Sequence, residues 1–350
     1  MSKRVLVAMS GGVDSSVALL LLKEQGYDPV GAMMKLFEKS RLCGSLNDLN
    51  VAQNITASMD IPFFVYDFTS EFDELVIQQF VDYYIKGATP NPCIVCNRYL
   101  KFGELFSCMS QQGADFFATG HYARIEQDSE SGRFILKKAL DEAKDQSYFL
   151  YSLSQEQLRH TLFPLGDYTK SQVREIAAAN SLDNANKSDS QDICFVRDGD
   201  YADFIEQYTK KKFDCGDFID TQGNVLGRHK GQIRYTVGQR KGLGIALNKP
   251  MYVLSKNPTD NTVTLCDDND LFSKSLDAFD FNWIAYDETP HPIRVQAKVR
   301  STHIPQWATA TQSSPDTVHI EFDKPQRAIA KGQAVVLYDN NIVVGGGTIG

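Results

Sequence analysis

The sequence lacks the features of a membrane or secreted protein. Its longest apolar run near the N-terminus, residues 17–22, is far too short to span a bilayer. The first residues enter an apolar segment at once and show no signal-peptide layout. We therefore expect a cytoplasmic protein without a membrane partner, in which the seven cysteines do not form a disulfide scaffold. Repeats and low-complexity tracts are also missing.

The chain has no excess of positive charge. Its 36 Lys and Arg residues face 44 Asp and Glu residues, which gives a net charge of -8. Bulk charge therefore does not favour nucleic-acid binding, although a local basic patch stays compatible with this balance. The other composition values, 42% hydrophobic and 23% charged residues, are ordinary for a globular protein, and 350 residues suffice for two or three domains.

The first loop carries the clearest local signal. An apolar run, residues 5–8, stops at small residues, and a run of helix formers, residues 17–23, follows directly. This predicts a buried strand, a tight glycine turn and a helix whose N-terminus attracts phosphate. A Gly-Lys-Ser/Thr string does not follow, which excludes the P-loop of kinases and GTPases, while a plain strand-to-helix turn is the alternative. The loop residues are Ala8, Met9, Ser10, Gly11, Gly12, Val13, Asp14, Ser15 and Ser16.

The first part of the chain alternates strand and helix patterns. Strands are expected at 28–35, 63–68 and 116–119, and helices at 48–59, 71–84, 101–112 and 169–180. A hairpin is expected at 124–140. Such alternation predicts an α/β domain, with a parallel sheet covered by helices on both faces and ligands at the carboxyl ends of the strands. Met34, Gly120 and His121 would then share one edge with the first loop.

The second part of the chain differs in character. Residues 225–250 hold six Lys or Arg residues and no Asp or Glu, which predicts contact with nucleic-acid phosphates, a solvated surface loop being the alternative. Short alternating strands follow and predict a small antiparallel β-barrel or sandwich. We expect a catalytic α/β domain at 1–197, a small central nucleic-acid-binding domain at 198–268 and a C-terminal β-barrel at 269–350.

Three cysteines stand in polar surroundings. Cys93 and Cys96 lie in a segment with two prolines, residues 89–97, which predicts a rigid extended loop, and Cys194 lies in a second polar loop. If both loops face the nucleotide edge, one thiol can carry a persulfide and the other can resolve it as a disulfide. A zinc site needs four ligands, and a second Cys-x-x-Cys is missing. An iron–sulfur cluster on the three thiolates, or a structural role, stays open.

The ordered motifs resemble one family over nearly the whole chain. The strings are Ser-Gly-Gly-Val-Asp-Ser-Ser, Thr-Pro-Asn-Pro-Cys-x-x-Cys-Asn, Ala-Thr-Gly-His-Tyr, Lys-Asp-Gln-Ser-Tyr-Phe-Leu, Asp-Ser-Gln-x-Ile-Cys-Phe and Gly-Gln-Arg-Lys-Gly-Leu-Gly. The first string resembles the pyrophosphate loop of the ATP-pyrophosphatase enzymes, and the set resembles the bacterial tRNA-specific 2-thiouridylases. The resemblance implies ATP-dependent 2-thiolation of the wobble uridine, position 34, in the tRNAs for Lys, Glu and Gln.

The resemblance also implies roles for single residues. Ala8 to Ser15, Met34 and Gly120 would contact ATP, Cys96 would be the nucleophile and Cys194 the persulfide carrier. The target base would meet Asn91, Pro92 and Cys93. Further contacts to the tRNA anticodon stem-loop would come from His121, Lys144, Asp145, Gln146, Arg300, Ser301 and Gln333.

The sequence departs from the family pattern at two places. Some relatives carry Asp where this chain has Cys93, and an Asp could act as general acid or base, whereas a Cys could do so only with a lowered pKa. Proton transfer is therefore handled elsewhere, or Cys93 has a redox or cluster role. The segment 300–305 also departs from the expected string, so the match of Arg300 and Ser301 is weaker.

The implied chemistry needs Mg²⁺ and a sulfur donor. Adenylation by ATP, with Mg²⁺ on the pyrophosphate, turns O2 of the uridine into a leaving group, and Asp14 is the candidate metal ligand. Its alternative role is that of an acidic residue favoured at a helix N-terminus. A persulfide-bearing partner protein would load Cys194. Two other functions stay open: a pyrophosphate-loop ligase for a small metabolite, and an RNA-binding adaptor with a relic nucleotide fold.

Overall fold

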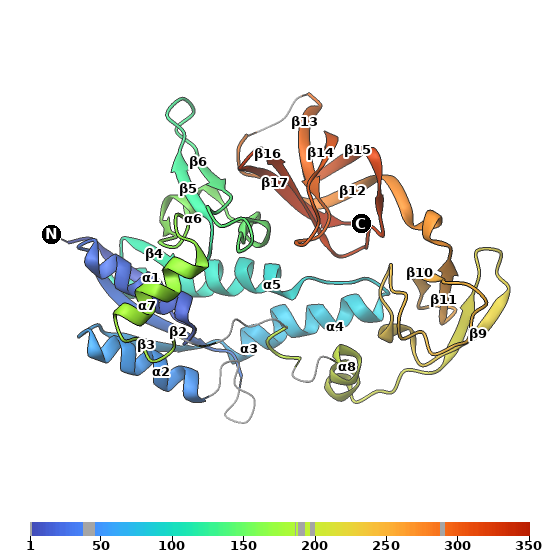
Figure 1. Cartoon of the computed structure of the whole chain (residues 1–350), viewed down its shortest axis with the longest axis horizontal. Coiled ribbons are helices and arrows are strands. Elements are labelled where there is room, and N and C mark those ends of the chain that lie inside the picture. The colour runs from blue at the N-terminus through green and yellow to red at the C-terminus, as the bar shows by residue number, and fades with distance from the viewer. Residues whose placement is uncertain (1, 38–45, 186, 188–192, 197–199, 288–290) are drawn as a thin grey trace.

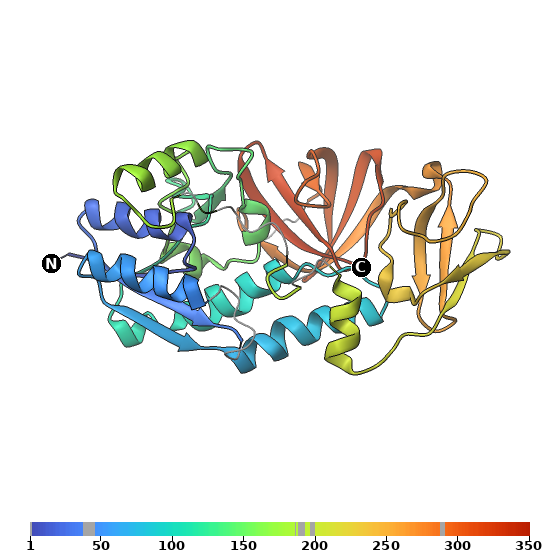
Figure 2. The ribbon, with the colours of Figure 1, turned by 60° about the horizontal axis from the view of Figure 1, so that its bottom comes forward.

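The chain folds into three β structures that lie side by side (Figures 1 and 2). The computed structural model describes residues 2–37, 46–185, 187, 193–196, 200–287 and 291–350. Cys43 and residues 188–192, which belong to the polar loop before Cys194, therefore lie outside the described residues. Among the helices of the described part, none combines the length and apolar character needed to cross a membrane.

The N-terminal part is built on a five-stranded parallel sheet. The strand order is β3-β2-β1-β4-β7, with β1 in the centre. The strands are β1 (Arg4–Ala8), β2 (Asp28–Lys35), β3 (Phe63–Asp67), β4 (Phe116–Thr119) and β7 (Thr161–Leu162). The predicted strands at 28–35, 63–68 and 116–119 are thus confirmed.

Helices cover both faces of this sheet, as predicted. Side chains alternate along β1, so that Val5 and Val7 join one apolar core and Leu6 joins another. The core of Val5 and Val7 contains side chains of α1 (Val13–Glu24), α2 (Leu46–Ser58) and α7 (Lys170–Ala179). The core of Leu6 contains side chains of α3 (Thr69–Phe72), π-helical η1 (Asp73–Ile77), α4 (Gln78–Ile85), α5 (Pro92–Val95) and π-helical η2 (Cys96–Leu105).

The predicted extended loop at 89–97 is wrong in its second half. Asn91 is extended, as a residue before proline should be, but Pro92 opens a helix that runs through α5 into η2. Proline is well tolerated at the first helical position, because the N–H that it lacks would have no helical acceptor there. Cys93 and Cys96 therefore lie on a helix. The expected helix at 101–112 begins earlier than predicted and ends in the short 3₁₀ turn η3 (Ser110–Gln112).

The C-terminal part is a closed six-stranded antiparallel barrel, as predicted. Its strand order is β12-β15-β14-β13-β16-β17, and β17 pairs with β12 to close it. The strands are β12 (Phe272–Trp283), β13 (Ile293–Lys298), β14 (Gln306–Ser314), β15 (Thr317–Arg327), β16 (Ala334–Asp339) and β17 (Ile342–Ile349).

The barrel is joined to the first part of the chain by strand pairing. The predicted hairpin is present as β5 (Arg124–Gln127) and β6 (Phe134–Lys137), and β6 pairs with β17. The short η4 (Ser147–Leu150) and α6 (Gln155–Arg159) follow the hairpin. Tyr148 is buried and donates its hydroxyl to the Ala334 carbonyl of the barrel at 2.8 Å. One apolar core thus runs from the α4 side of the sheet into the outer face of the barrel.

A small four-stranded sheet lies between these parts in sequence. Its order is β10-β11-β8-β9, with β8 and β11 parallel and the other pairs antiparallel. The elements are α8 (Tyr201–Thr209), β8 (Gly216–Ile219), β9 (Val225–His229), η5 (Gln232–Arg234), β10 (Tyr252–Asn257), β11 (Thr262–Cys266) and η6 (Asp268–Leu271). The domain boundaries 1–197, 198–268 and 269–350 stay predictions.

Candidate nucleotide and thiol site

The carboxyl edge of the parallel sheet collects the predicted nucleotide residues. Ala8, the last residue of β1, pairs with Ala32 of β2 on one side and Thr119 of β4 on the other. The chain leaves β1 between these two neighbours, which makes this edge the switch point of the sheet, where α/β folds bind ligands. Met34, near the end of β2, and Gly120, directly after β4, lie at the same edge.

Two glycines of this edge are required by close approach. Gly11 has a φ of 71°, and a Cβ there would lie 2.5 Å from the Asp48 carbonyl oxygen. At Gly120 a Cβ would lie 2.7 Å from the Ser15 backbone nitrogen. Side chains are therefore excluded at both positions, and the backbone of the first loop stays tightly wrapped around the start of α1.

Hydroxyl groups fix the shape of the first loop. Ser15 Oγ accepts the Ser10 N–H at 3.2 Å and donates to the Gly12 carbonyl at 3.1 Å, and Ser16 Oγ donates to the same carbonyl. Asn184, from the segment after α7, donates its amide to the Gly11 carbonyl and to Ser16 Oγ. The first N–H groups of α1 have no helical acceptor and remain for a ligand at this end.

Two lysines that no sequence pattern indicated border the loop. Lys170, at the start of α7, places its Nζ 2.8 Å from both carboxylate oxygens of Asp14, and the Tyr122 hydroxyl donates to one of these oxygens. Lys187 contacts the Gly11 carbonyl and forms an ion pair with Asp48. A loop of N–H groups, hydroxyls and two ammonium groups fits the phosphates of ATP.

The three candidate thiols come together near this edge. Cys93 and Cys194 are exposed and Cys96 is half-buried. Cys194 lies close enough to interact electrostatically with both Cys93 and Cys96. Two segments about one hundred residues apart in sequence thus bring their cysteines into one region of the fold, and the sulfur relay between them stays a prediction.

Cys194 is placed by the residue that follows it. The Phe195 side chain is buried and makes edge-to-face contacts with Phe72 of α3 at 5.8 Å and Phe80 of α4 at 5.0 Å between ring centroids. It also contacts Phe204 of α8 at 5.2 Å. This aromatic cluster, Phe72, Phe80, Phe195 and Phe204, holds the main chain on the C-terminal side of Cys194.

Lys101 is a positive charge that acts on Cys93 and Cys96, and sequence reasoning missed it. Burial raises the pKa of Cys96 to about 11, and the Lys101 ammonium is the first opposing influence, whereas Cys194 and Cys93 raise the pKa further. Lys101 comes five residues after Cys96 in η2, and the wider turn of a π-helix brings such a pair closer to one face than an α-helix would. The spacing Cys-x₄-Lys was the available signal, but it carries meaning only in a π-helix.

His121 is held in its neutral form beside this cluster. Burial, assisted by the Lys101 charge, lowers its pKa well below the usual range. Its Nδ1 lies 2.7 Å from Thr119 Oγ1, and its ring lies 6.0 Å from Phe102 and 6.1 Å from Phe163 between centroids. A neutral imidazole can donate or accept one hydrogen bond here but adds no charge.

Metal ligation finds no support in the geometry. Within the part of the chain that the structure describes, His, Cys, Asp and Glu side chains do not gather in groups of three that could hold a metal ion. The cysteine trio is therefore not arranged as a cluster site. Both oxygens of Asp14 contact Lys170, so the predicted direct Mg²⁺ ligation by Asp14 does not fit this arrangement.

The predicted RNA-contacting residues lie in different surroundings. Gln146 accepts the Tyr122 N–H, and Asp145 accepts the N–H groups of Ala139 and Ser147, so both side chains support their own loop. Lys144, which directly precedes them in the sequence, is half-buried.

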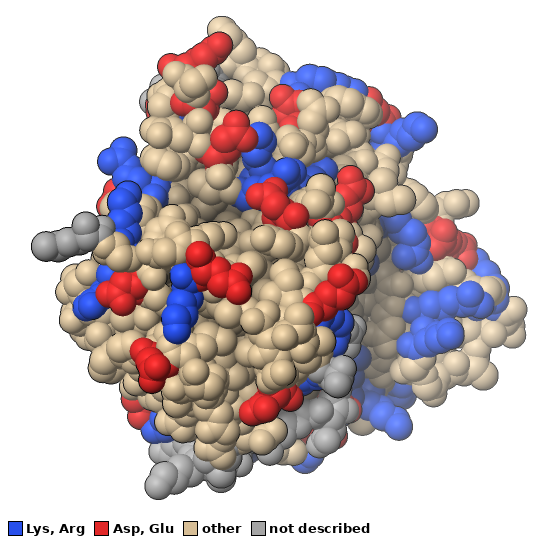
Figure 3. Space-filling view, turned by 60° about the vertical axis from the view of Figure 1, so that its left-hand side comes forward, with Lys and Arg blue, Asp and Glu red and all other residues tan. Residues whose placement is uncertain are grey.

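Residues 225–250, the basic stretch, contact the C-terminal barrel at Gly238. Gly238 packs against Arg300 and Arg327, since a Cβ there would lie 3.8 Å and 3.6 Å from their guanidinium groups. Burial, with Arg327 nearby, lowers the pKa of Arg300, whose guanidinium donates to the Ala328 carbonyl. Ser301 beside it is half-buried. In the view of Figure 3, Lys and Arg side chains gather on the right-hand part of the molecule, to the right of a hollow in its surface.

Half of the six basic residues in 225–250 are paired with acids from other segments. Arg234 reaches Asp203 at 2.7 Å and Glu206 at 3.4 Å, Arg228 reaches Asp217, and Lys249 reaches Asp267. Intramolecular ion pairs therefore engage three of the six cations of this stretch, and its contact with nucleic-acid phosphates stays a prediction. Three exposed cations form no ion pair with a described residue: Lys230, Arg240 and Lys241.

Cys93 and Cys96 lie on the continuous helix formed by α5 and η2, here called the cysteine helix. Gln333 of the barrel contacts the segment before this helix. Its Nε2 donates to the carbonyls of Thr89 at 3.0 Å and Pro90 at 3.1 Å. The predicted RNA-contacting residues Gln333, Asn91 and Pro92 thus lie in one neighbourhood.

Comparison with known proteins identifies relatives over the whole chain. Family models match in three consecutive parts: a tRNA methyl transferase HUP domain at residues 3–198, a tRNA methyl transferase PRC-barrel domain at 202–267 and an aminomethyltransferase β-barrel domain at 273–349. A tRNA-specific 2-thiouridylase MnmA of Clostridioides difficile is 51% identical over 100% of this chain and 98% of the relative. One of Acetivibrio thermocellus is 48% identical over 99% of both chains.

Solved structures resemble the chain only distantly. A 4-thiouridine synthetase–RNA complex with bound ATP matches 59% of this chain and 50% of that chain, at 16% identity and a TM-score of 0.39. A likeness of this size supports no functional conclusion.

We predict that Gly11→Ala weakens ATP binding about tenfold or more, because the left-handed backbone alone costs about 1–2 kcal/mol and the new methyl group displaces the loop from Asp48. The measurement is titration calorimetry with ATP. The matched control is Gly113→Ala, where φ is also positive but nothing lies within 4 Å of the added Cβ. Equal ATP affinity in Gly11→Ala and the unchanged protein would contradict the close-approach role.

We predict that Lys101→Met slows alkylation of Cys96 by iodoacetamide at pH 8, by roughly three- to tenfold. Removing the cation raises the pKa of Cys96 further above about 11, so the thiolate fraction falls at every pH below that value and recovers above it. Mass spectrometry of the Cys96 peptide gives the rate, and Lys101→Arg, which keeps the charge, serves as the control. A rate that is the same in all three proteins would show that Lys101 has no influence on this thiol.

Proposed function

Because this chain belongs to the tRNA-specific 2-thiouridylase family, we propose that it is an ATP-dependent tRNA-uridine 2-sulfurtransferase. The proposed substrate is the wobble uridine, position 34, of the tRNAs for Lys, Glu and Gln. A tRNA substrate also implies that the protein acts in the cytoplasm.

The observation that carries this proposal is the convergence of Cys96 and Cys194. A ligase for a small metabolite would need the nucleotide loop but no pair of approaching thiols from two distant segments. The exposed Cys194 is accessible to a donor protein, and the half-buried Cys96 is protected from it, which supports the carrier role for Cys194 and the resolving role for Cys96.

The proposed reaction has an activation step and a sulfur-transfer step. The uridine O2 attacks the α-phosphate of ATP, which releases pyrophosphate and leaves O2 adenylated. The terminal sulfur of the Cys194 persulfide then forms a bond to C2, and AMP leaves with the oxygen. Cys96 attacks the Cys194 sulfur, which frees 2-thiouridine and leaves a Cys96–Cys194 disulfide that a reductant must reopen.

The resolving thiol must lose a proton before it attacks. Its pKa of about 11 keeps Cys96 protonated near pH 7, which protects it from oxidation between turnovers. Lys101 stabilises the thiolate when it forms. Although Cys93 has exposed surface, the protein around its thiol desolvates it and raises its pKa, so we propose contact with the target base for it rather than acid–base catalysis.

ATP would lie on the first loop. Its phosphates would meet Ala8 to Ser15, together with Lys170 and Lys187, and its nucleoside would lie toward Met34 and Gly120. We propose that Mg²⁺ enters with ATP on the phosphate oxygens rather than on Asp14. The Asp14–Lys170 ion pair would then supply a cation that can turn toward the phosphates.

The tRNA would reach the site through its anticodon loop. The target base must leave the stack of loop bases to enter an active-site pocket. We propose that Asn91, Pro92 and Cys93 meet this base, and that the backbone and neighbouring bases are held by His121, Lys144, Asp145, Gln146, Arg300, Ser301 and Gln333. Because the side chains of Asp145 and Gln146 support their own loop, their contribution would come through the loop surface and Lys144.

We predict that Cys96→Ser and Cys194→Ser each abolish formation of 2-thiouridine while leaving tRNA-dependent AMP formation. The first loop is separate from both thiols, so activation survives when transfer does not. The measurement is nucleoside mass spectrometry of tRNA after incubation with ATP, Mg²⁺, a persulfide-bearing donor protein and a reductant. Cys266→Ser, which changes a buried cysteine of β11, is the control. Normal 2-thiouridine yield from either active-site variant would refute the relay, and AMP formation triggered by a small molecule instead of tRNA would favour a ligase.

We predict that Arg240→Ala combined with Lys241→Ala weakens tRNA binding and makes its salt dependence shallower, because both exposed cations would neutralise phosphates. The expected loss is about tenfold at low salt. Filter binding across a salt series measures both quantities. Arg234→Ala is the comparison, since its guanidinium is paired with Asp203 and Glu206, and it should leave the salt slope unchanged. An unaltered slope in the double variant would exclude this contact.

A further inference from the structure

The barrel holds the entrance of the cysteine helix through three hydrogen bonds. The Thr89 N–H donates to the Lys331 carbonyl at 2.8 Å, and Gln333 Nε2 donates to the carbonyls of Thr89 and Pro90. An amide nitrogen has two hydrogens, and both are used here. The bonded carbonyls lie directly before Asn91, so they fix where α5 begins.

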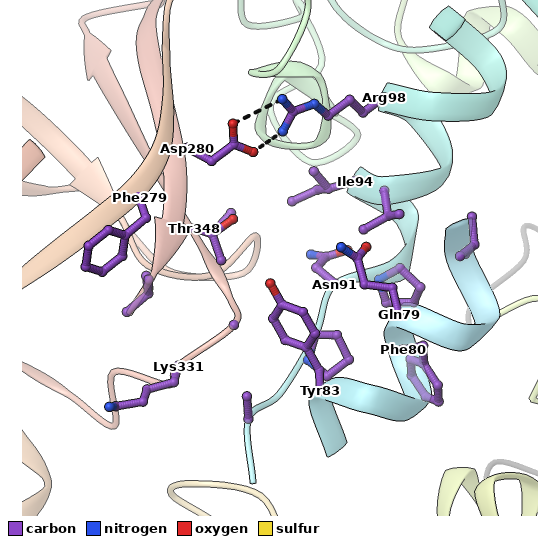
Figure 4. Close-up of a pocket in the computed structure, with 18 of the residues that line it drawn as sticks. Gln79, Phe80, Tyr83, Asn91, Ile94, Arg98, Phe279, Asp280, Lys331 and Thr348 are labelled. Atoms are coloured by element: carbon purple, nitrogen blue, oxygen red, sulfur yellow. Dashed lines mark hydrogen bonds and ion pairs between the residues drawn. The ribbon is translucent and has the colours of Figure 1, made fainter. Parts of the chain in front are cut away.

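A second tie lies just beyond Cys96. The Arg98 guanidinium forms a bidentate ion pair with Asp280 of β12, which Figure 4 shows at the far end of the same helix segment. Two-point pairs of this kind restrict orientation as well as distance. The barrel therefore holds the helix on both sides of Cys93 and Cys96.

The space between the two ties is not filled with side chains. A cavity of about 350 Å³ separates the helix from the barrel there, lined by Asn91 and Ile94 on one side and by Phe279 and Thr348 on the other (Figure 4). Atoms that face a cavity lack packing partners, so packing does little to fix the helix against the barrel along this stretch. One face of the helix packs in the core of Leu6, and its position relative to the barrel depends on the ties at its ends.

We propose that Gln333 is a positioning residue for sulfur transfer, which sets the place of Cys96 relative to Cys194 by holding the Thr89 and Pro90 carbonyls. The two thiols are carried by separate segments. Cys194 is placed by the aromatic cluster around Phe195, and Cys96 by the barrel. The proposal rests on the proposed function, because it assigns this geometry to the transfer step.

The same side chain can also take part in RNA binding without giving up this role. Its two N–H donors face the protein, which leaves its Oε1 as the atom that can accept a hydrogen bond from RNA. RNA contact through Nε2 would instead release the segment at 89–90. Gln333→Glu separates these roles, since it keeps an acceptor, loses both donors and places negative charge against two carbonyl oxygens.

The test compares Gln333→Glu with the unchanged protein in single-turnover sulfur transfer. At saturating tRNA we expect the transfer rate to fall on the order of 10- to 100-fold, and to fall more than the rate of AMP formation measured in the same reaction. Asp280→Asn, which removes the charge and one of the two acceptor oxygens of the second tie, should lower the rate of the same step. Gln312→Glu is the matched control, because that amide contacts the Pro315 carbonyl within the β14–β15 hairpin.

Two further measurements do not depend on tRNA activity. Hydrogen exchange of residues 88–98 should become faster in Gln333→Glu and not in Gln312→Glu, and the yield of a Cys96–Cys194 disulfide under mild oxidation should drop. If exchange and disulfide yield are unchanged, the positioning role is wrong. If they change while the unchanged protein makes no 2-thiouridine, the proposed function fails and the barrel tie stands.

Discussion

The pairing of β1 with both β2 and β4 is the constraint on which the site depends. Because β1 is central and its neighbours run parallel to it, the carboxyl ends of β1, β2 and β4 lie at one edge of the sheet. The tight passage of Gly120 against Ser15 follows from this pairing, and it fixes the start of α1. The nucleotide loop, the end of β4 and His121 take their places from these few backbone contacts.

The thiol region has a different physical basis, since it is assembled from segments that meet only in the tertiary fold. Phe195 anchors one thiol in an aromatic cluster, and the helix from Pro92 carries the others. Desolvation by the surrounding protein makes Cys93 and Cys96 poor acids, and the Lys101 ammonium offsets part of that cost. The site thus combines a rigid nucleotide loop with a pair of thiols whose separation is set by independent anchors, and chemistry between them requires both anchors to be in place.

Much of the fold could be predicted from the sequence because its signals are local. The apolar run and glycines of the first loop, the alternation in β12 to β17 and the turn of the β5–β6 hairpin each depend on neighbouring residues. The helix at Pro92 could not be predicted, because a proline suits both an extended loop and a first helical turn. The ion pairs of Lys170, Lys187 and Arg234 could not be predicted either, since no sequence pattern shows which distant charges will form pairs.

The pairing of β6 with β17 has a consequence for any truncation that removes the C-terminal barrel. The hairpin that contributes β6 belongs to the N-terminal half of the chain, while β17 is the last strand of the barrel. Removing the barrel would strip the outer edge of β6 and uncover Tyr148, so the truncated fragment would present bare backbone donors and acceptors beside an apolar patch. An unpaired strand edge of this kind can pair with a strand of another copy of the chain. By covering β6, the C-terminal barrel therefore also prevents self-association of the half that bears the nucleotide loop.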